Sequence, residues 1–286
     1  MKKIHQIIFL TRLNKPIGFL LLFWPCSWGL TLANLYNQTF QKYALYIVLF
    51  FLGSVLMRSA GCIVNDIVDR KFDKKISRTK HRPLASGKIK LFEAMFYVFA
   101  LCFLAFIILI QFNKQTIFLG MASMIFAFSY PFMKRFTYWP QLFLGFTFNW
   151  GIVMAWTSIN INLSYEPFVL YVAAIFWTLG YDTIYGLQDL EDDEIIGLKS
   201  TSIKFRKNVK IFVSICYSTT IAFLLFLSVF VNANIFYFLI IIMIAYQFHL
   251  QVKKFNKRDP ETCHRAFKSN NYIGILVLAS LLTLYI

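Results

Sequence analysis

Charged side chains are scarce in this chain. Lysine, arginine, aspartate and glutamate together make up 15% of its 286 residues, whereas ordinary soluble domains hold about 25%. Hydrophobic residues make up 58%, and many of them form runs of the ~20 residues that cross a bilayer as a helix. The composition excludes a soluble domain and predicts an all-α integral membrane protein.

Cysteine and histidine are also few, and their positions do not match known site patterns. The five cysteines show no paired or metal-type spacing, and four of them fall within apolar runs, where cysteine acts as a small packing residue. His5, His81, His249 and His264 show no ligand spacing either. Because His81 lies in a basic loop, it is interpreted as a solvated side chain rather than a general base.

Nine apolar runs predict about nine transmembrane helices. They lie near residues 17–35, 43–66, 91–111, 115–133, 140–159, 167–188, 209–231, 234–250 and 270–286. No low-complexity stretch and no linker rich in proline, glycine or serine divides the chain. Residues 1–286 are therefore predicted to form a single transmembrane domain.

The basic residues indicate how the chain is oriented. Almost all of the 29 lysines and arginines lie in the N-terminal tail or in alternate loops, and the other loops hold only Lys42 and Lys114. Since such residues stay on the cytoplasmic side, the N-terminus is expected inside the cell and the C-terminus outside. No basic stretch is separable from a membrane flank, so the net charge of +16 does not indicate nucleic-acid binding.

The start of the chain bears on its location. Its first apolar run is too short for a signal peptide, and no small-residue cleavage site follows, so the first helix is expected to be retained. No arginine-rich amphipathic presequence precedes that helix. This favours a bacterial inner membrane over a processed mitochondrial protein, which stays the alternative.

Acidic residues are the rarest charged group, and they are clustered. Of only 13, nine lie in two stretches, "NDIVDRKFD" at 65–73 and "DTIYGLQDLEDDE" at 182–194. Each stretch closes an apolar run and opens a basic loop. The predicted topology places both at the cytoplasmic surface, because the second and sixth helices run in the same direction.

Helical spacing arranges these residues into two stripes, because positions three, four and seven apart share a helix face. Asn65, Asp69 and Asp73 form one stripe, and the other consists of Asp182, Tyr185, Asp189 and Asp193. A stripe cannot also include Glu191, Asp192 and Glu194, for which solvated helix ends are an equally good interpretation.

Carboxylates at a helix C-terminus require a compensating cation, because the helix dipole disfavours negative charge there. Lysines and arginines from the adjoining loops could supply it. Oxygen-rich clusters also suit Mg²⁺, which is usually held by a few carboxylates together with substrate phosphates. Two such clusters facing each other would hold a diphosphate through bridging metal ions.

Several basic residues could complement that diphosphate. Arg58 lies seven residues before Asn65 on the same helix face, two turns inside the membrane, where a charge normally faces a cavity. Snorkelling to lipid headgroups is the alternative. The other candidates all lie on the predicted cytoplasmic side: Arg12, Lys15, Arg78, Arg82, Lys134 and Arg135. Each of these six could equally be an orientation signal, whereas as a group they can bind phosphate.

The same residues carry a resemblance to a known family. The matching stretches are "RLNKPIGFLLLFWPCSWGL", "RSAGCIVNDIVDRKFDKKISRTKHRPLASG", "YPFMKRFTYWPQLFLG", "NWGIVMAW", "YDTIYGLQDLEDDEIIGLKSTSI" and "FKSNNYIG". They span nearly the whole chain, and the second and fifth are specific. With them the chain resembles the UbiA-type intramembrane prenyltransferases, in particular those that prenylate 4-hydroxybenzoate for ubiquinone.

That resemblance implies nine helices around a central cavity that opens sideways to lipid. It implies Mg²⁺ as cofactor, held by Asn65, Asp66, Asp69, Asp73, Asp189 and Asp193. Arg135 matches a basic position used near the diphosphate and joins these carboxylates as a catalytic candidate. Asn14 departs from the aspartate common in the family, but it lies outside the metal motifs.

The implied reaction joins a polyprenyl diphosphate to 4-hydroxybenzoate through an allylic carbocation, giving the 3-prenylated acid. Asp182 or a released diphosphate oxygen are two candidates for the proton acceptor. Other acceptors within the family are a naphthoate, homogentisate or haem. A membrane transporter is the alternative from another class, although transporters tend to bind near the bilayer midplane on broken helices.

Overall fold

The computed structural model describes residues 2–37, 40–74, 79–160, 162 and 164–286. Within these residues the chain is helical and forms no strand. The helices are α1 (Lys2–Thr11), α2 (Ile17–Asn37), α3 (Phe40–Val68), α4 (Arg70–Asp73), α5 (Leu91–Leu109), α6 (Lys114–Phe136), α7 (Pro140–Asn149), α8 (Gly151–Ile159), α9 (Tyr165–Gly186), α10 (Leu190–Ile195), α11 (Thr201–Lys204), α12 (Val209–Phe230), α13 (Ile235–Lys254), α14 (Pro260–Lys268) and α15 (Asn270–Leu282), with short 3₁₀ turns η1 (Leu187–Asp189) and η2 (Thr283–Tyr285).

Nine helical segments in the described part of the chain are long and apolar enough to cross a membrane. Each coincides with one of the nine predicted spans, so the all-α, multi-pass prediction is confirmed. The last segment begins at Pro260 rather than near residue 270. Its first turns form the charged helix α14, which a search for apolar runs misses. Asp259 caps this helix by accepting hydrogen bonds from the Glu261 and Thr262 amides at 3.0 and 3.4 Å.

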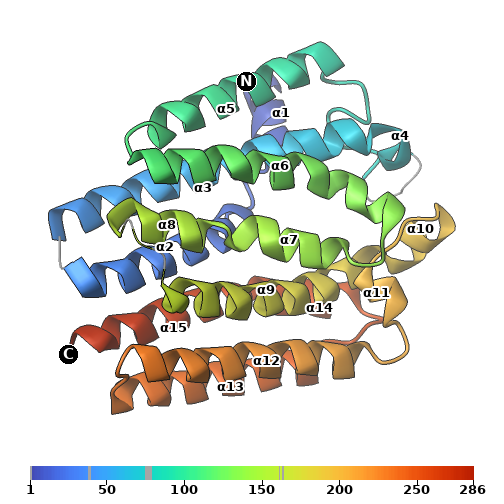
Figure 1. Ribbon diagram of the computed structural model, residues 1–286. Coiled ribbons are helices and arrows are strands. Elements are labelled where there is room, and N and C mark those ends of the chain that lie inside the picture. Colours follow the sequence, from blue (N-terminus) through green and yellow to red (C-terminus); the bar gives the residue numbers. More distant parts are fainter. Residues whose placement is uncertain (1, 38–39, 75–78, 161, 163) are drawn as a thin grey trace.

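The helices lie side by side (Figure 1). In that view α5 lies along one edge and α12 with α13 along the opposite edge, while α7, α8 and α9 lie between them. The central spans are the most buried and α5 is the most exposed. A bundle of this kind gives α5 an outer face for lipid and leaves the central helices to line a site.

An aromatic core joins α2, α9 and α15. The Trp28 and Trp177 rings lie 5.0 Å apart, and Tyr181 stands edge-on to Trp177 at 5.0 Å. Both indole N–H groups are satisfied, since Trp28 donates to the Gly274 carbonyl at 2.9 Å and Trp177 to the Asn270 side chain at 2.8 Å. The two buried indoles, with their polar N–H groups paired, fix these three helices relative to one another.

Gly29 permits a close approach of α2 to α8. A Cβ atom at this position would overlap the backbone of Ile152, which cannot move aside as a flexible side chain could. Gly53 on α3 is different, because a Cβ there would meet nothing within 4 Å. Gly29 is therefore required by packing between membrane helices, whereas Gly53 is not.

We expect Gly29→Val to lower the free energy of unfolding by roughly 1–3 kcal/mol, because overpacking forces α2 and α8 apart. The matched control is Gly53→Ala, which adds a methyl group in open space and favours the helix by about 0.5–1 kcal/mol. Thermal unfolding of both variants in detergent measures the difference. Equal melting temperatures for the two variants contradict the assigned contact.

Candidate active site

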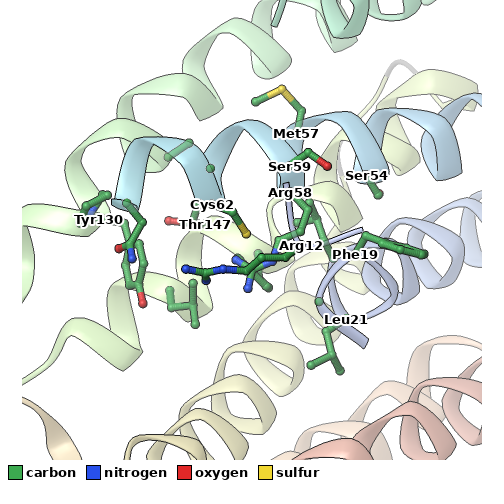
Figure 2. A pocket seen from close by; sticks show the side chains of 18 of the residues that line it. Arg12, Phe19, Leu21, Ser54, Met57, Arg58, Ser59, Cys62, Tyr130 and Thr147 are labelled. Carbon is green, nitrogen blue, oxygen red and sulfur yellow. The ribbon is translucent and has the colours of Figure 1, made fainter. Parts of the chain in front are cut away.

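A cavity of about 740 Å³ lies among α2, α3, α5, α6, α7, α8 and α9. Figure 2 shows side chains from three different segments entering it: Arg12 from the turn before α2, Arg58 and Cys62 from α3, and Tyr130 from α6. One end of the cavity is lined by charged residues and the other by apolar ones. The cavity therefore has a polar mouth and an apolar interior.

The cavity collects most of the site residues predicted from sequence. Those among its lining residues are Arg12, Lys15, Arg58, Asn65, Asp66, Asp69, Asp73, Arg82, Lys134, Asp182, Tyr185, Asp189 and Asp193. The two acidic stretches, whose nearest members Asp73 and Asp182 are 109 positions apart in the chain, thus border one space. Arg78 lies outside the described residues.

The first acidic stretch keeps its helical spacing through a break. Helix α3 ends at Val68 and α4 begins at Arg70, with Asp69 between them. The Asp69 amide still donates to the Asn65 carbonyl at 2.9 Å, and the Asp73 amide to the Asp69 carbonyl at 2.8 Å. These i to i−4 bonds hold Asn65, Asp69 and Asp73 on one face, which is why all three reach the cavity.

Two arginines hold the buried carboxylates of this stretch. Arg12 Nη2 lies 2.6 Å from Asp66 Oδ1, and Arg82 Nη1 lies 3.1 Å from the same oxygen. Arg82 Nη1 also donates to Asp73 Oδ2 at 2.9 Å. Asp66 and Asp73 are only 2% and 4% exposed, and a buried carboxylate without a partner costs several kcal/mol. The arginines therefore supply the compensating charge that the helix end requires.

Arg12 reaches Asp66 from an unusual backbone conformation. Its φ is 56°, in the left-handed region that non-glycine residues rarely adopt. The turn is closed by the Lys15 amide, which donates to the Arg12 carbonyl at 2.9 Å. Burial lowers the pKa of Arg12, but the Asp66 carboxylate raises it above its ordinary value overall. The ion pair therefore offsets both the strain of the turn and the burial of the guanidinium.

Asp69 has a looser environment than its neighbours. Arg135 Nη2 lies 3.6 Å from Asp69 Oδ1, beyond hydrogen-bond range. Burial raises the pKa of Asp69, while Lys134 and Arg135 act in the opposite direction. Of the three buried aspartates in this stretch, Asp69 is the one whose carboxylate accepts no hydrogen bond from an arginine in the described residues, so its oxygens can still bind another cation.

Arg135 lies beside Asp69 at the edge of the cavity mouth. Its side chain is not among the residues that line the cavity. Instead Nη2 donates to the Val68 carbonyl at 2.9 Å, and the guanidinium lies over the rings of Phe72 and Phe132. Arg135 holds the end of α3 from behind Asp69.

Residues of the second acidic stretch also reach the cavity, although the helix changes type twice between Asp182 and Asp193. Helix α9 ends at Gly186, the 3₁₀ turn η1 follows, and α10 begins at Leu190. Asp189 and Asp193 nevertheless both line the cavity. The three acids excluded from the stripe, Glu191, Asp192 and Glu194, do not line it, and Glu194 forms an exposed ion pair with Arg206 at 2.8 Å.

The side chains of the two acidic stretches are of the kind that binds Mg²⁺. Among the residues described, no three histidine, cysteine, aspartate or glutamate side chains converge as a ready metal cluster. The donor set nevertheless consists of carboxylate oxygens and one amide, the oxygen ligands that Mg²⁺ prefers. Mg²⁺ rarely occupies an all-protein cage and usually completes its shell with water and phosphate oxygens. These residues therefore fit a metal ion that arrives together with a phosphate group.

Arg58 lies about two helical turns deeper than Asn65 on α3 and points into the cavity, not toward lipid (Figure 2). Its guanidinium lies 5.3 Å from the centre of the Phe148 ring. Gly18 on α2 makes room for it, because a Cβ there would come within 2.9 Å of Arg58 Nε. In the described chain Arg58 pairs with no carboxylate within 4.0 Å, so its charge is available to an anionic ligand.

Sequence reasoning missed the apolar part of the wall. Gly53, Met57 and Gly61 line the cavity, and each stands four residues from the next, with Asn65 continuing the series. A Cβ at Gly61, as at Gly53, would meet nothing within 4 Å. The four-residue spacing that revealed the acids could have revealed this groove as well.

The interior of the cavity is closed at one end and open at one side. Phe50 and Phe112, 4.8 Å apart, belong to a buried cluster at the inner end. Phe99 and Phe103 of α5 line the cavity and are also 70% and 54% exposed on the outer surface. The wall at α5 is therefore part of the surface that faces lipid, as the expected sideways opening requires.

Fold and site together define a multi-pass membrane protein in which carboxylates and arginines line the mouth of an apolar cavity. The chain belongs to the UbiA prenyltransferase family, whose model matches residues 22–277. The predicted family and its enzyme class are thereby confirmed.

Full-length relatives share this assignment. The chain is 40% identical over 285 residues to a 4-hydroxybenzoate octaprenyltransferase of Psychromonas ingrahamii, covering 100% of this chain and 98% of the relative. It is also 40% identical to a mitochondrial 4-hydroxybenzoate polyprenyltransferase of Caenorhabditis elegans, covering 95% of this chain and 76% of the relative.

Solved structures share the fold. A UbiA homolog from Aeropyrum pernix matches with a TM-score of 0.76 and 22% identity, over 95% of this chain and 98% of the other. A homolog from Archaeoglobus fulgidus, bound to DMAPP and Mg²⁺, matches with a TM-score of 0.72 and 17% identity, over 98% of both chains.

Replacing Arg82 with methionine removes one positive partner from two buried carboxylates. We expect Arg82→Met to lower the free energy of unfolding by roughly 1–3 kcal/mol, because Asp73 is left without its ion pair. The matched control is Arg206→Met, which breaks the exposed pair with Glu194 and should change stability by less than about 1 kcal/mol. Denaturant unfolding in detergent gives both values, and an equal effect of the two changes contradicts the assigned role of Arg82.

Proposed function

We propose that the protein transfers a polyprenyl group from a polyprenyl diphosphate to the 3-position of 4-hydroxybenzoate, a step of ubiquinone synthesis. The observation that carries the proposal is the convergence of two acidic helix ends and several arginines at the mouth of one apolar cavity. The relatives at 40% identity over the whole chain, which bear this activity in their names, support it.

The mouth of the cavity suits the diphosphate. We assign Asn65, Asp66, Asp69 and Asp73 on one side, and Asp189 and Asp193 on the other, to hold Mg²⁺ ions. When bound, Mg²⁺ supplies positive charge to the oxygens of the departing diphosphate. Arg12, Lys15, Arg82 and Lys134 line the same region and can bind phosphate oxygens directly.

The interior suits the prenyl chain. The groove over Gly61 and Gly53 continues inward from Asn65 along α3, so a chain whose diphosphate lies at the mouth can extend along it. Apolar walls keep water away from the allylic cation that forms when the C1–O bond breaks. Aromatic faces such as Phe148 and Tyr130, which line the cavity, can stabilise that cation.

Arg58 suits the aromatic acid. Its unpaired guanidinium can bind a carboxylate bidentately, and the ring of Phe148 beside it provides a surface for stacking. A 4-hydroxybenzoate held by its carboxylate at Arg58 would have its ring in the apolar part of the cavity. Tyr185, which lines the wall between Asp182 and Asp189, is assigned to contact a substrate there.

The location follows from the charge pattern of the loops. We assign the protein to a bacterial inner membrane, with the N-terminus and both acidic stretches on the cytoplasmic side, because the basic residues concentrate there. Residues 1–286 act as one unit in this proposal, since the cavity takes residues from α1 through α14.

Two other functions have less support. Prenylation of a naphthoate or homogentisate would also place a carboxylate at Arg58, and haem is a further acceptor, so these alternatives differ in the acceptor and not in the site. Transport of a cation is disfavoured, because the acids gather at one end of the bundle rather than at mid-depth.

The proposal is tested with purified protein, labelled 4-hydroxybenzoate and geranyl diphosphate, in the presence of Mg²⁺ or EDTA. We expect a lipophilic labelled product with Mg²⁺ and none with EDTA. Absence of product with folded protein, also with a longer prenyl diphosphate, contradicts the proposed acceptor. Product with a naphthoate or homogentisate would then identify the alternative.

Asp69→Asn and Asp189→Asn should each lower kcat at least about 100-fold, because each removes a charged ligand from the diphosphate end. Asp192→Asn, in the same acidic stretch but outside the cavity lining, is the control and should retain activity. Initial rates in membranes at saturating Mg²⁺ measure the effect. Rates close to wild type in either of the first two variants reject the metal assignment.

Arg58→Gln should raise the KM for 4-hydroxybenzoate by about 10-fold or more, since it removes a charge-assisted pair with the carboxylate. The KM for the prenyl diphosphate should stay near its wild-type value, because Arg58 lies below the mouth. Steady-state kinetics with each substrate varied in turn separates the two. If only the KM for the prenyl diphosphate changes, Arg58 binds the diphosphate and the assignment to 4-hydroxybenzoate is wrong.

A further inference from the structure

Prenylation of the ring creates a proton that must leave. When the ring carbon next to the hydroxyl forms its bond to C1, that carbon carries both hydrogen and the prenyl group, and aromaticity returns only when the proton is lost. The proposed chamber excludes water, so a protein group or the released diphosphate must take it. This inference rests on the proposed function.

Asp182 is the carboxylate at the right depth. Six aspartates line the cavity in the described part of the chain, and five of them stand at its mouth: Asp66, Asp69, Asp73, Asp189 and Asp193. Asp182 lies on α9, seven residues before Asp189, which is about 10 Å deeper along a helix. Arg58 on α3 lies seven residues before Asn65, at a comparable depth on another wall.

The carboxylate oxygens of Asp182 are not occupied by protein donors in the described residues. In the described part of the chain it forms no ion pair and no hydrogen bond through its side chain, unlike Asp66 and Asp73, which arginines hold. Its electrostatic neighbours are Lys134 and Arg58, whose charges offset the cost of a carboxylate in an apolar chamber. A carboxylate in this position has lone pairs directed to no protein donor and can accept a proton.

Other groups that line the cavity suit the task less well. The carboxylates at the mouth are assigned to the metal ions and the arginines. His264 lies on α14, which packs against both α9 and η1. The Phe267 ring, about one turn deeper on α14, contacts the Tyr185 ring at 4.5 Å, so His264 lies nearer the mouth than Tyr185 does. Tyr130 and Tyr181 are phenols, which are weak bases until ionised. Asp182 is the group that combines depth, charge and access.

We propose that Asp182 is the base that removes the C3 proton of the prenylated 4-hydroxybenzoate. The C1–O bond breaks with its electron pair on the diphosphate, and a π pair of the ring forms the C3–C1 bond. The C3–H pair then returns to the ring, and the proton passes to an oxygen of the Asp182 carboxylate. Diphosphate and 3-prenyl-4-hydroxybenzoate are the products, and the proton leaves Asp182 before the next turnover.

The test compares 4-hydroxybenzoate with the same acid deuterated at C3 and C5, in the wild type and in Asp182→Asn. In the wild type we expect equal rates with the two acids, because ionisation of the diphosphate is slower than proton loss. In Asp182→Asn we expect kcat to fall about 100-fold, the usual contribution of a general base, and the deuterated acid to react more slowly than the ordinary one. The KM for 4-hydroxybenzoate should change little.

Two controls separate catalysis from structure. Asp182→Glu keeps a carboxylate and should recover part of the rate without an isotope effect, and Asp192→Asn should behave as the wild type. A slow Asp182→Asn enzyme without an isotope effect overturns the proposal and leaves the released diphosphate as the base. A wild-type rate in Asp182→Asn also overturns it. If the wild type gives no product with either acid, the proposed function fails and this inference fails with it, an outcome distinct from the other two.

Discussion

The ion pairs between buried carboxylates and arginines at the end of α3 are the interaction on which the site depends. Three aspartates within eight residues are buried at the end of a helix whose dipole already disfavours negative charge. Arg12 and Arg82 offset this charge, and in doing so they tie the turn before α2 and the loop after α4 to the cavity mouth. The same guanidinium groups line the space that a negatively charged diphosphate and its positively charged metal ions would occupy.

One face of α3 shows how the cavity changes from polar to apolar. Residues four apart run from Asp73 and Asp69 through Asn65 to Gly61, Met57 and Gly53. Carboxylates and an amide therefore stand at the mouth, and bare backbone lines the interior. Helix interiors lose about 1 kcal/mol with glycine in place of alanine, and neither Gly53 nor Gly61 is required by packing. These two glycines instead leave open space in the cavity, and this space fits a long apolar substrate.

Periodicity in the sequence predicted the spans and the two acidic stripes, because apolar runs and four-residue spacing follow from helix geometry alone. It could not predict which arginine reaches which carboxylate, since that depends on loops such as the left-handed turn at Arg12. It also could not predict that Lys134 lines the cavity while Arg135 contacts the end of α3, since this depends on how α6 packs against α3. The charged helix α14 was missed because it is helical without being apolar.

The most direct measurement of the central claim is an experimental structure of the protein with Mg²⁺ and a prenyl thiolodiphosphate that resists cleavage. We predict metal ions and the diphosphate between Asp69 and Asp189, with Arg12 and Arg82 beside the phosphates and the prenyl chain over Gly61. The claim is contradicted if the diphosphate binds elsewhere while the carboxylates of both stretches keep only their protein partners.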